Sequence, residues 1–474
     1  MKSNALSTVI QNYLERLKRL QPRVARIINE IAEEGGRAVL VGGVVRDLIM
    51  GVASKDIDIE VYGLALAQLE SILRRQGPVS LVGKSFGVLR LHGLDIDWSI
   101  PRSDSPGRKP AVTFDPTLNI ERAFARRDLT INAMGIDMHN GKLIDPFGGL
   151  QDIEHKVLRS PDPTFFEQDP LRFYRMMQFI SRLEFYPDQH LHTLCKSMDV
   201  STVSRERIES EFEKMLLKSK RPSLGLRWIQ TLGRMNELFP ELGALVGCQQ
   251  RDDYHPEGDV FEHSMQALDA AAMLAQKITD SRQKLILLYA ALCHDFGKPL
   301  VTKNIKGVWR SINHDAQGVI PTKSFLRRLM RNAEIIEPVV LLVRYHMQPL
   351  QFISNKAKAS AYKRLALKLA PSTSLAMLAL LALADKRGRN PKSHDPLASC
   401  PDDKIIKEFV AKAQKAYVEY RPEEPLLQGR DLMGMVQPGP EMGKVLRAAY
   451  EIQLDEGITD KEELKRRVFE KNNA

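Results

Sequence analysis

The 474-residue sequence has few cysteines and no long apolar segment. Its longest apolar runs, LILLYAALC and LAMLALLALA, fall short of the ~20 residues that span a bilayer. The first residues mix charges among apolar positions and so lack the continuous apolar stretch of a signal peptide. We therefore expect a cytoplasmic protein without a membrane segment. Disulfide frameworks and zinc ribbons are disfavoured because no C-x-x-C pair occurs among the scattered cysteines, which are Cys195, Cys248, Cys293 and Cys400.

What the chain has in excess is positive charge. Its formal net charge of +10 favours a polyanionic partner, because Lys and Arg attract phosphate groups at long range. A basic protein without such a partner is the alternative on charge alone. Apolar residues make up 43% and charged residues 27%, a balance that excludes disordered and fibrous proteins. The length allows about three domains of roughly 150 residues each.

Periodicity along the chain predicts an α+β protein in which the strands are confined to one region. Short β-rich runs such as DIDIEVY alternate with helices in a head that we expect to contain a small mixed sheet. Amphipathic helices follow the head, and GRNPKSHDPLASCPDD has the composition of a linker. The expected divisions are a helical arm at 1–36, the head at 37–150, a helical neck at 151–250, a second helical block at 251–390 and a helical tail at 391–474.

A strand, a tight turn and a helix are predicted for AVLVGGVVRDLIMG. Gly42 and Gly43 allow the backbone to approach a ligand closely, and the start of the helix presents its free N–H groups there. This arrangement suits a triphosphate. Arg46 would add a charged contact, because a guanidinium matches phosphate oxygens.

Three carboxylates follow this turn. Asp56 and Asp58 alternate on a β-rich run, so their side chains point to the same face of a strand. LDIDWSIPR supplies a third, for which Asp97 is favoured over Asp95. Oxygen ligands suit Mg²⁺, and three of them beside a phosphate-binding turn predict a two-metal site for phosphoryl or nucleotidyl transfer. The alternative for a lone D-x-D is the polar face of an edge strand, and the upstream glycines favour the metal site.

With these motifs the chain resembles the class II tRNA nucleotidyltransferases, which are the CCA-adding enzymes and bacterial poly(A) polymerases of the polymerase-β superfamily. DPFGGLQDIEHKVLR resembles the run that joins head to neck in this family, and VSRERIESEFEKML resembles a neck helix. The resemblance covers nearly the whole chain. RRDLTINAMGID resembles the family's nucleotide-binding motif, which implies nucleotide-binding roles for Arg126, Arg127, Asp128 and Asn132.

The motif QDPLRFYR resembles the one whose Asp and Arg read the incoming base, which implies roles for Asp169, Arg172 and Arg175. Cytosine and adenine both present an amino donor beside a ring-nitrogen acceptor, so Asp169 as acceptor and Arg172 as donor would select them. An i, i+3 surface pair on a helix is the alternative. Family members usually carry Glu where this chain has Gln168, a difference that bears on nucleotide choice.

Two further segments have a functional and an ordinary interpretation. Residues 102–125 have the turn and basic residues of a flexible loop, which in the resembled enzymes helps to switch from C to A and so favours complete CCA addition. Within it, Arg108 and Lys109 fit either this role or that of ordinary solvated charges. Gly439 and Pro440 in the tail fit either a phosphate contact at a helix start or a plain turn.

Five of the eleven histidines are clustered between residues 255 and 346, namely His255, His263, His294, His314 and His346. Apolar helices end on His294-Asp295 and on Asp385, and buried groups of this kind need compensation such as a metal ion. The H…HD…D spacing resembles the HD phosphohydrolase domain. This resemblance implies metal ligands at His263, His294, Asp295 and Asp385, and a second metal or a phosphate contact at His314 and His346. A decayed, structural HD domain is the alternative.

These features predict an enzyme that adds CCA to tRNA 3′ ends from CTP and ATP, with Mg²⁺ in the head and a divalent metal of undetermined identity in the HD domain. Within the same superfamily the rivals are a CC-adding enzyme, an A-adding enzyme and a poly(A) polymerase. From another class, the rival is an HD phosphohydrolase that uses the head only to hold RNA. The sequence leaves the oligomeric state and the hydrolytic substrate open.

Overall fold

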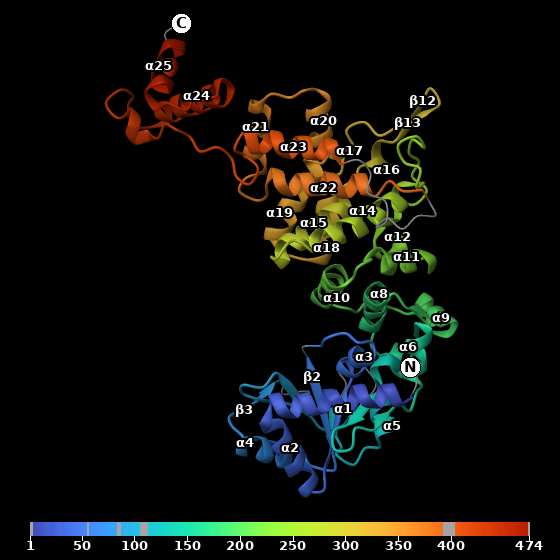
Figure 1. Cartoon of the computed structure of the whole chain (residues 1–474). Helices are drawn as coiled ribbons and strands as arrows, with labels where there is room; N and C mark the ends of the chain where they lie inside the picture. Colours follow the sequence, from blue (N-terminus) through green and yellow to red (C-terminus); the bar gives the residue numbers. More distant parts are fainter. Residues whose placement is uncertain (1–2, 55, 83–86, 105–111, 392–402, 473–474) are drawn as a thin grey trace. The chain divides into compact units, whose positions relative to one another are not determined.

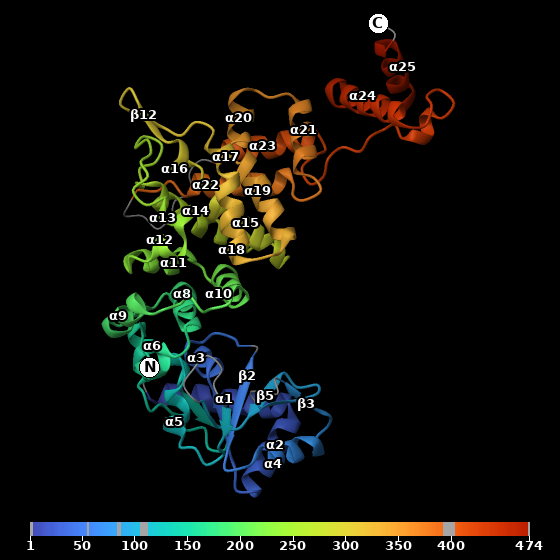
Figure 2. The same cartoon turned by 180° about the vertical axis from the view of Figure 1, so that it is seen from behind.

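The computed structural model describes residues 3–54, 56–82, 87–104, 112–391 and 403–472. The chain divides into two compact units, Met1–Ser204 and Arg205–Ala474. Figures 1 and 2 show the chain from opposite sides.

A seven-stranded mixed sheet is the centre of the first unit, which confirms the predicted fold class. Its strand order is β3-β4-β5-β2-β1-β8-β9. The neighbours β2 and β5, side by side in Figure 2, run parallel, whereas the other neighbouring strands are antiparallel. The strands are β1 (Arg37–Val41), β2 (Ile57–Tyr62), β3 (Val79–Val82), β4 (Val88–Leu91), β5 (Ile96–Ser99), β8 (Gly135–Asp137) and β9 (Leu143–Ile144).

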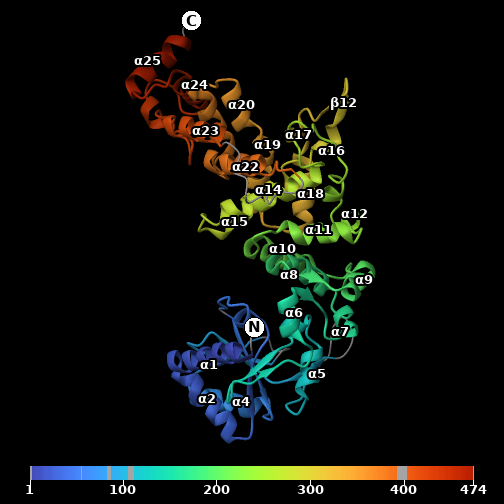
Figure 3. The ribbon, with the colours of Figure 1, turned by 45° about the vertical axis from the view of Figure 1, so that its right-hand side comes forward.

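Four helices pack on this sheet: α1 (Ser3–Leu20), α2 (Pro22–Glu33), α3 (Gly43–Ile49) and α4 (Leu66–Arg75). Helix α2 buries Val24, Ile27, Ile28 and Ile31, which have the i, i+3, i+4, i+7 spacing of an amphipathic helix. These side chains share one apolar core with the sheet. Figure 3 shows α1, α2 and α4 beside one another.

The remainder of the first unit consists of two short strand pairs and further helices. A small antiparallel pair, β6 (Arg102–Asp104) and β7 (Val112–Phe114), occupies the predicted loop, whereas Arg108 and Lys109 lie outside the described residues. A second pair is β10 (Val157–Leu158) with β11 (Tyr186–Pro187). The helices are α5 (Ile120–Ala125), α6 (Gly149–His155), α7 (Pro163–Glu167), α8 (Leu171–Leu183) and α9 (Gln189–Ser197), with a 3₁₀ turn at Thr130–Asn132.

The second unit is largely helical, as predicted. Its centre is α14 (Val260–Ala275) packed against α15 (Ser281–Cys293) and α22 (Leu375–Arg387). Around them lie α10 (Arg205–Lys218), α11 (Ser223–Thr231), α12 (Met235–Leu238), α13 (Pro240–Gly243), α16 (Lys298–Val301), α17 (His314–Gln317), α18 (Val319–Leu329), α19 (Ala333–Tyr345), α20 (Gln348–Ser354), α21 (Ala359–Leu369) and α23 (Lys404–Lys415).

One hairpin interrupts these helices, a detail that the all-helical prediction for this region did not contain. Strands β12 (Lys303–Ile305) and β13 (Val308–Arg310) pair antiparallel and project from the helices in Figure 1. Lys306 and Gly307 both have positive φ, of 52° and 81°, as a two-residue hairpin turn of the primed type requires.

The tail has its own apolar cluster. The tail contains α24 (Pro440–Glu456) and α25 (Lys461–Asn472) after a 3₁₀ turn at Gly429–Leu432. Its cluster includes the buried residues Leu432, Ile452 and Leu464. Most of the predicted linker, residues 392–402, lies outside the described residues. Among the described helices of both units, none is long and apolar enough to cross a membrane.

Candidate functional site

Two of the predicted metal ligands of the head lie opposite each other on parallel strands. In the register of β2 and β5, Asp58 is the partner of Asp97, and Asp56 precedes β2 by one residue. Asp97 accepts hydrogen bonds from Arg90, with nitrogen–oxygen distances of 2.6 and 2.7 Å. Loss of hydration raises the pKa of Asp58, and so do the neighbouring carboxylates of Asp97 and Asp56. The site therefore concentrates negative charge that a divalent cation would relieve.

The predicted glycine turn lies directly beside these carboxylates. Val41, the last residue of β1, pairs with Asp58, and Gly42 follows with φ of +78°. A Cβ atom on Gly42 would lie 3.0 Å from Nη1 of Arg127 and 3.7 Å from Oδ2 of Asp58. Glycine is therefore needed here both for the backbone conformation and for the space.

Arg46 has internal partners. Its side chain is buried and donates to Oδ1 of Asp47 at 2.6 and 2.8 Å and to Oδ1 of Asn132 at 2.5 Å. Asn132 in turn donates to Oδ1 of Asp128 at 2.9 Å. Arg46 thus ties α3 to the RRD motif, and its predicted phosphate contact stays a prediction.

Glu60 is a further charged residue of this site that sequence reasoning missed. It lies on β2 two residues after Asp58 and is 2% exposed. Its carboxylate accepts a hydrogen bond from the Tyr62 hydroxyl at 2.7 Å and lies 3.6 Å from Arg126 and 3.7 Å from Arg127. The alternation of Asp56, Asp58 and Glu60 along the strand was the available signal, and it places all three on one face.

The predicted base-reading motif is linked to the RRD motif. Arg175 donates to Oδ2 of Asp128 at 2.5 and 2.8 Å. Burial alone would raise the pKa of Asp128, but Arg175, Asn132 and Arg172 lower it to about 2. Arg172 donates to the backbone carbonyls of Phe165, at 2.7 Å, and Arg126, at 2.5 Å.

Asp169 and Gln168 lie at the junction of two helices. Gln168 caps the C-terminus of α7, and Oδ1 of Asp169 accepts the backbone N–H of Leu171 at 3.2 Å near the start of α8. The backbone N–H of Arg172 donates to the carbonyl oxygen of Asp169 at 2.9 Å, so these two predicted base-reading residues are neighbours on the chain and in space.

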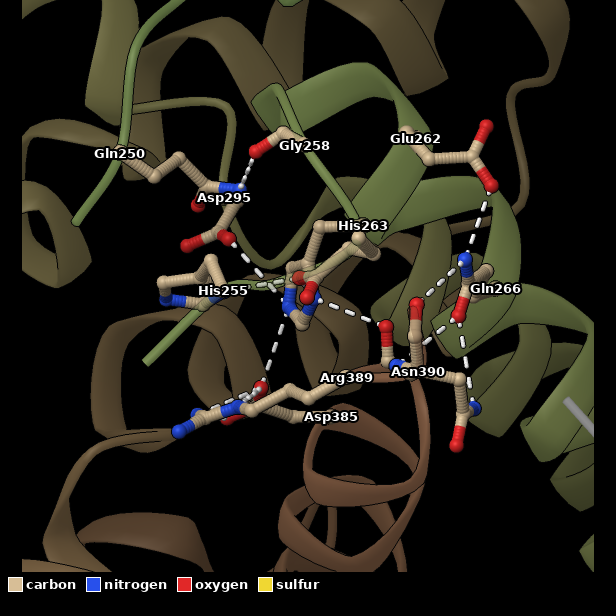
Figure 4. Close-up of polar contacts among 12 residues, drawn as sticks. Gln250, His255, Gly258, Glu262, His263, Gln266, Asp295, Asp385, Arg389 and Asn390 are labelled. Carbon is tan, nitrogen blue, oxygen red and sulfur yellow. Dashed lines mark hydrogen bonds and ion pairs between the residues drawn. The ribbon is translucent and has the colours of Figure 1, made fainter. Parts of the chain in front are cut away.

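The structure brings the predicted HD ligands together in the second unit. Figure 4 shows three of them, His263, Asp295 and Asp385. His263 lies in the first turn of α14, His294 and Asp295 follow α15, and Asp385 lies near the end of α22. Nε2 of His263 is 3.2 Å from Nε2 of His294, 3.1 Å from Oδ1 of Asp385 and 3.6 Å from Oδ2 of Asp295. All four side chains are buried.

His314 and His346 complete a second group around Asp295. Their Nε2 atoms are 3.1 Å apart, and Nε2 of His314 is 3.4 Å from Oδ1 of Asp295. Burial, together with His314 and His294, lowers the pKa of His346 to about 3, so its imidazole is neutral at pH 7. Asp295 belongs to both groups, an arrangement suited to bridging two metal ions.

The hydrogen bonds of these histidines fit metal binding. Nδ1 of His294, His314 and His346 each lies 2.7–2.8 Å from a backbone carbonyl oxygen three residues upstream. A carbonyl oxygen only accepts, so Nδ1 carries the proton and the Nε2 lone pair faces the centre. Two facing lone pairs repel each other unless a cation lies between them, and the mixed nitrogen and oxygen donors suit a divalent metal.

Four polar residues of the HD site were not among the predicted ligands. Oε1 of Glu257 is 2.9 Å from Nδ1 of His255 and 2.8 Å from Nδ1 of His263, and these contacts lower the pKa of Glu257 to about 2 despite its burial. Lys298 lies 2.7 Å from Asp295, and Arg389 lies 2.8 Å from Asp385. Their i+3 and i+4 spacing from the predicted aspartates was the available signal for Lys298 and Arg389.

A cavity of about 430 Å³ opens over this site. Its lining includes Asp295, His314 and His346 together with Trp309, Arg310 and Tyr254. Trp309 is 36% exposed, whereas Trp98 and Trp228 are buried. An exposed tryptophan and an arginine beside a candidate metal site form a surface suited to a flat ring that carries a phosphate.

Comparisons with known proteins match both regions of the chain to known families. Residues 38–159 match the family described as Poly A polymerase head domain, and residues 260–387 match the HD domain. A Multifunctional CCA protein of Pasteurella multocida strain Pm70 is 33% identical over 363 residues, which cover 74% of this chain and 83% of that protein. One of Xanthomonas campestris pv. campestris strain B100 is 30% identical over 430 residues, which cover 86% of this chain and 96% of that protein.

Solved structures share the fold along nearly the whole chain. The Bacillus stearothermophilus CCA-adding enzyme in complex with CTP superposes with a TM-score of 0.65 and 19% identity, covering 96% of this chain and 98% of that one. The Thermotoga maritima CCA-adding enzyme complexed with tRNA superposes with a TM-score of 0.58 and 21% identity, covering 95% and 94%. At these identities the likeness is one of fold.

Proposed function

The chain belongs to the class II CCA-adding enzymes, a family of tRNA nucleotidyltransferases, and carries an HD domain; we propose that its own head residues add C and A to tRNA 3′ ends from CTP and ATP. The single observation that carries this proposal is the pairing of Asp58 with Asp97 across parallel strands, beside the turn at Gly42. Relatives over most of the chain are CCA proteins, and solved structures of the same fold contain CTP or tRNA.

Asp56, Asp58 and Asp97 would hold two Mg²⁺ ions, because clustered carboxylates and substrate phosphates are the ligands that Mg²⁺ takes. When bound, Mg²⁺ stabilises the attacking and leaving oxygens of nucleotidyl transfer. The RNA 3′-hydroxyl attacks the α-phosphate of the nucleotide, and pyrophosphate leaves. The backbone at Gly42 and Gly43 would receive the triphosphate at the start of α3.

Some arginines of the site would contact the nucleotide, and others form contacts with neighbouring residues of the site. Glu60 would orient Arg126 and Arg127 toward the triphosphate, because it is a buried carboxylate 3.6–3.7 Å from both. Asp128 fixes Arg175, and Arg172 with Asp169 would read the amino group and ring nitrogen of cytosine and adenine. The nucleotides that the protein incorporates will show how Gln168 affects base selection.

The first experiment offers the purified protein tRNA that lacks CCA, together with Mg²⁺ and with CTP and ATP separately and combined. Sequenced 3′ ends that stop at CCA support the proposal. Ends with C alone, a single A added only to a CC end, or a long A run would instead assign a CC-adding enzyme, an A-adding enzyme or a poly(A) polymerase. No incorporation under any condition would refute nucleotidyl transfer.

The proposal also covers organisation and location. We assign residues 37–150 to the head, 151–250 to the neck, 251–390 to the HD domain and 391–474 to the tail, with the boundary between the two compact units inside the neck. A cytoplasmic location is consistent with the tRNA substrate and with the few, scattered cysteines of the sequence.

A second activity, metal-dependent phosphohydrolysis by the HD domain, is favoured by one observation. The two His/Asp groups share Asp295 and lie beneath the cavity that Trp309 and Arg310 line. A divalent metal bound there would activate water against a phosphoester. Arg310 would hold the phosphate and Trp309 a nucleobase.

Two readouts test this activity on the full-length protein with Mg²⁺ or Mn²⁺. Phosphate release from adenosine monophosphates should exceed that from ribose 5-phosphate, and Asp295→Asn should abolish both. Adenosine monophosphate should also quench the fluorescence of Trp309, because a stacked base quenches an exposed indole. The Trp309→Phe variant lacks this fluorescence and so identifies it. Equal rates for the two substrates and no such quenching would contradict the base-binding role.

A further inference from the structure

A second cavity in the unit Arg205–Ala474 has a cationic rim and an apolar floor. Its volume is about 700 Å³, and it lies where α18 meets α19. The rim carries Arg205, Lys323, Arg327 and Arg331, together with the carboxylate of Glu337. Met330, Ile336 and Val340 form the floor and are buried. We call this feature the cationic cavity.

Three of its cations lack acidic partners. Among the residues that the structure describes, the side chains of Lys323, Arg327 and Arg331 form no ion pair or hydrogen bond, and all three residues are exposed. Neighbouring basic residues differ: Arg328 pairs with Glu241, and Arg344 lies 3.6 Å from Asp315. The cationic cavity therefore brings three unpaired cations together on one rim.

Folding stability does not account for this arrangement. Lys323 and Arg327 are an i, i+4 pair of like charge on α18, and such pairs destabilise a helix by roughly 0.2–0.5 kcal/mol. The helix dipole stabilises a cation in the last turn, which explains Arg327. It does not explain Lys323 one turn earlier, nor Arg331 beyond the helix, directly before the positive N-terminal end of α19 at Asn332.

We propose that the cationic cavity binds the phosphate backbone of the RNA substrate. Lys323 and Arg327 are separated by one helical turn of about 6 Å along α18, so they face successive points along an extended strand. Arg205, whose Nη1 donates to the backbone carbonyl of Arg327 at 3.3 Å, extends the same rim. The apolar floor of Met330, Ile336 and Val340 would contact the apolar faces of the sugars that accompany the phosphates. This inference rests on the proposed function, because tRNA is the polyanion that the proposed function supplies.

The test compares two triple variants of the full-length protein. In the first, Lys323→Gln, Arg327→Gln and Arg331→Gln are combined. In the matched control, Lys277→Gln, Lys407→Gln and Lys415→Gln remove the same charge from exposed lysines of the same unit. Affinity for tRNA lacking CCA is measured by fluorescence anisotropy between 50 and 300 mM salt, and circular dichroism confirms that both variants fold.

We expect the first variant to bind tRNA on the order of tenfold more weakly, with the slope of log affinity against log salt reduced by about 2–3, since each lost phosphate contact removes ~0.7–0.9. The control should change both quantities far less. CTP incorporation at saturating tRNA should persist in both variants, because neither alters the head.

Four outcomes would overturn the inference. Equal affinities and slopes for the two variants would show that the cavity does not contact RNA. Inorganic pyrophosphate is added at the phosphate concentration of the tRNA. If it competes with tRNA for the wild-type protein but not for the first variant, the cavity is a site for free anions. If wild-type protein extends tRNA but the first variant binds it normally, the proposed function stands alone; if wild-type protein neither binds nor extends tRNA, both fall.

Discussion

Asp58 lies opposite Asp97 across parallel strands. It also lies beside the turn at Gly42, whose positive φ favours glycine. Replacing Asp58 by Asn keeps the shape of the side chain and removes the charge that would hold Mg²⁺. We expect CTP incorporation to fall at least about 100-fold, because stabilisation of the transferring phosphate depends on this charge. Incorporation is measured with tRNA lacking CCA, and thermal unfolding should match that of the wild type.

The control for this prediction also decides between the two aspartates of LDIDWSI. Asp97→Asn should resemble Asp58→Asn, since Asp97 is the cross-strand partner of Asp58, whereas Asp95→Asn should retain activity within a few-fold. Wild-type rates for Asp58→Asn, or a greater loss for Asp95→Asn than for Asp97→Asn, would contradict the assignment of the head site.

A second residue-scale prediction concerns stability. Asp269 on α14 is fully buried and accepts hydrogen bonds from the backbone N–H of Ser223 at 3.0 Å and from its hydroxyl at 2.7 Å. Burial raises the pKa of Asp269 to about 6, against about 3.9 in the unfolded chain. The folded state therefore binds an extra proton between these values, and the stability that this proton contributes is present below about pH 4 and lost as the pH rises through 6.

Asp269→Asn removes this dependence, because the amide does not titrate. Between pH 4.5 and 7 the free energy of unfolding of the wild type should fall by about 2 kcal/mol more than that of the variant. Urea unfolding at the two pH values measures the difference. Asp252→Asn, at an exposed position, should behave like the wild type, and parallel profiles for wild type and Asp269→Asn would disprove the assigned pKa.

At the scale of elements, the HD site depends on how closely short helices approach one another. A Cβ atom on Gly297 would lie 2.0 Å from the carbonyl oxygen of His314 and 2.5 Å from the backbone nitrogen of Gly318. Gly297→Ala must therefore push the segment before α16 away from α17, which separates Asp295 from His314. We expect a loss of about 1–3 kcal/mol in stability and weakened metal binding by the HD domain.

Thermal unfolding and calorimetric titration with Mn²⁺ measure these effects. Gly429→Ala is the matched control, because a Cβ atom there has nothing within 4 Å. Equal melting temperatures and metal affinities for the two variants would mean that the close approach of these elements does not hold the site.

At the scale of the whole molecule, the head and the HD domain belong to different compact units, so their activities should separate. Asp295→Asn should abolish metal binding by the HD groups and leave CTP incorporation within about twofold. Asp58→Asn should do the reverse. The two variants are assayed side by side for Mn²⁺ binding and for tRNA extension. An RNA-processing activity that survives Asp56→Ala but not Asp295→Ala would instead favour the HD domain as the main catalyst.

Residues that lie close along the chain could be placed from the sequence. The strand, turn and helix around Gly42, the alternation of Asp56 and Asp58, and the ends of apolar helices at His294 and Asp385 all follow local periods of 2 or 3.6 residues. Local geometry determines these features, so a single sequence displays them. The α+β class follows for the same reason, because β-rich runs occur in one region of the chain.

Contacts between distant segments were decided only by the tertiary structure. Arg46 meets Asn132 across 86 residues, and Asp385 approaches His263 from the opposite end of the HD domain. The periodicity of a single segment does not specify these contacts, because they depend on how whole helices and strands pack against one another. The sequence by itself determined the strand, turn and helix-end motifs that carry the candidate residues, because these motifs are local. The tertiary structure decided which of those residues share charge, protons and space.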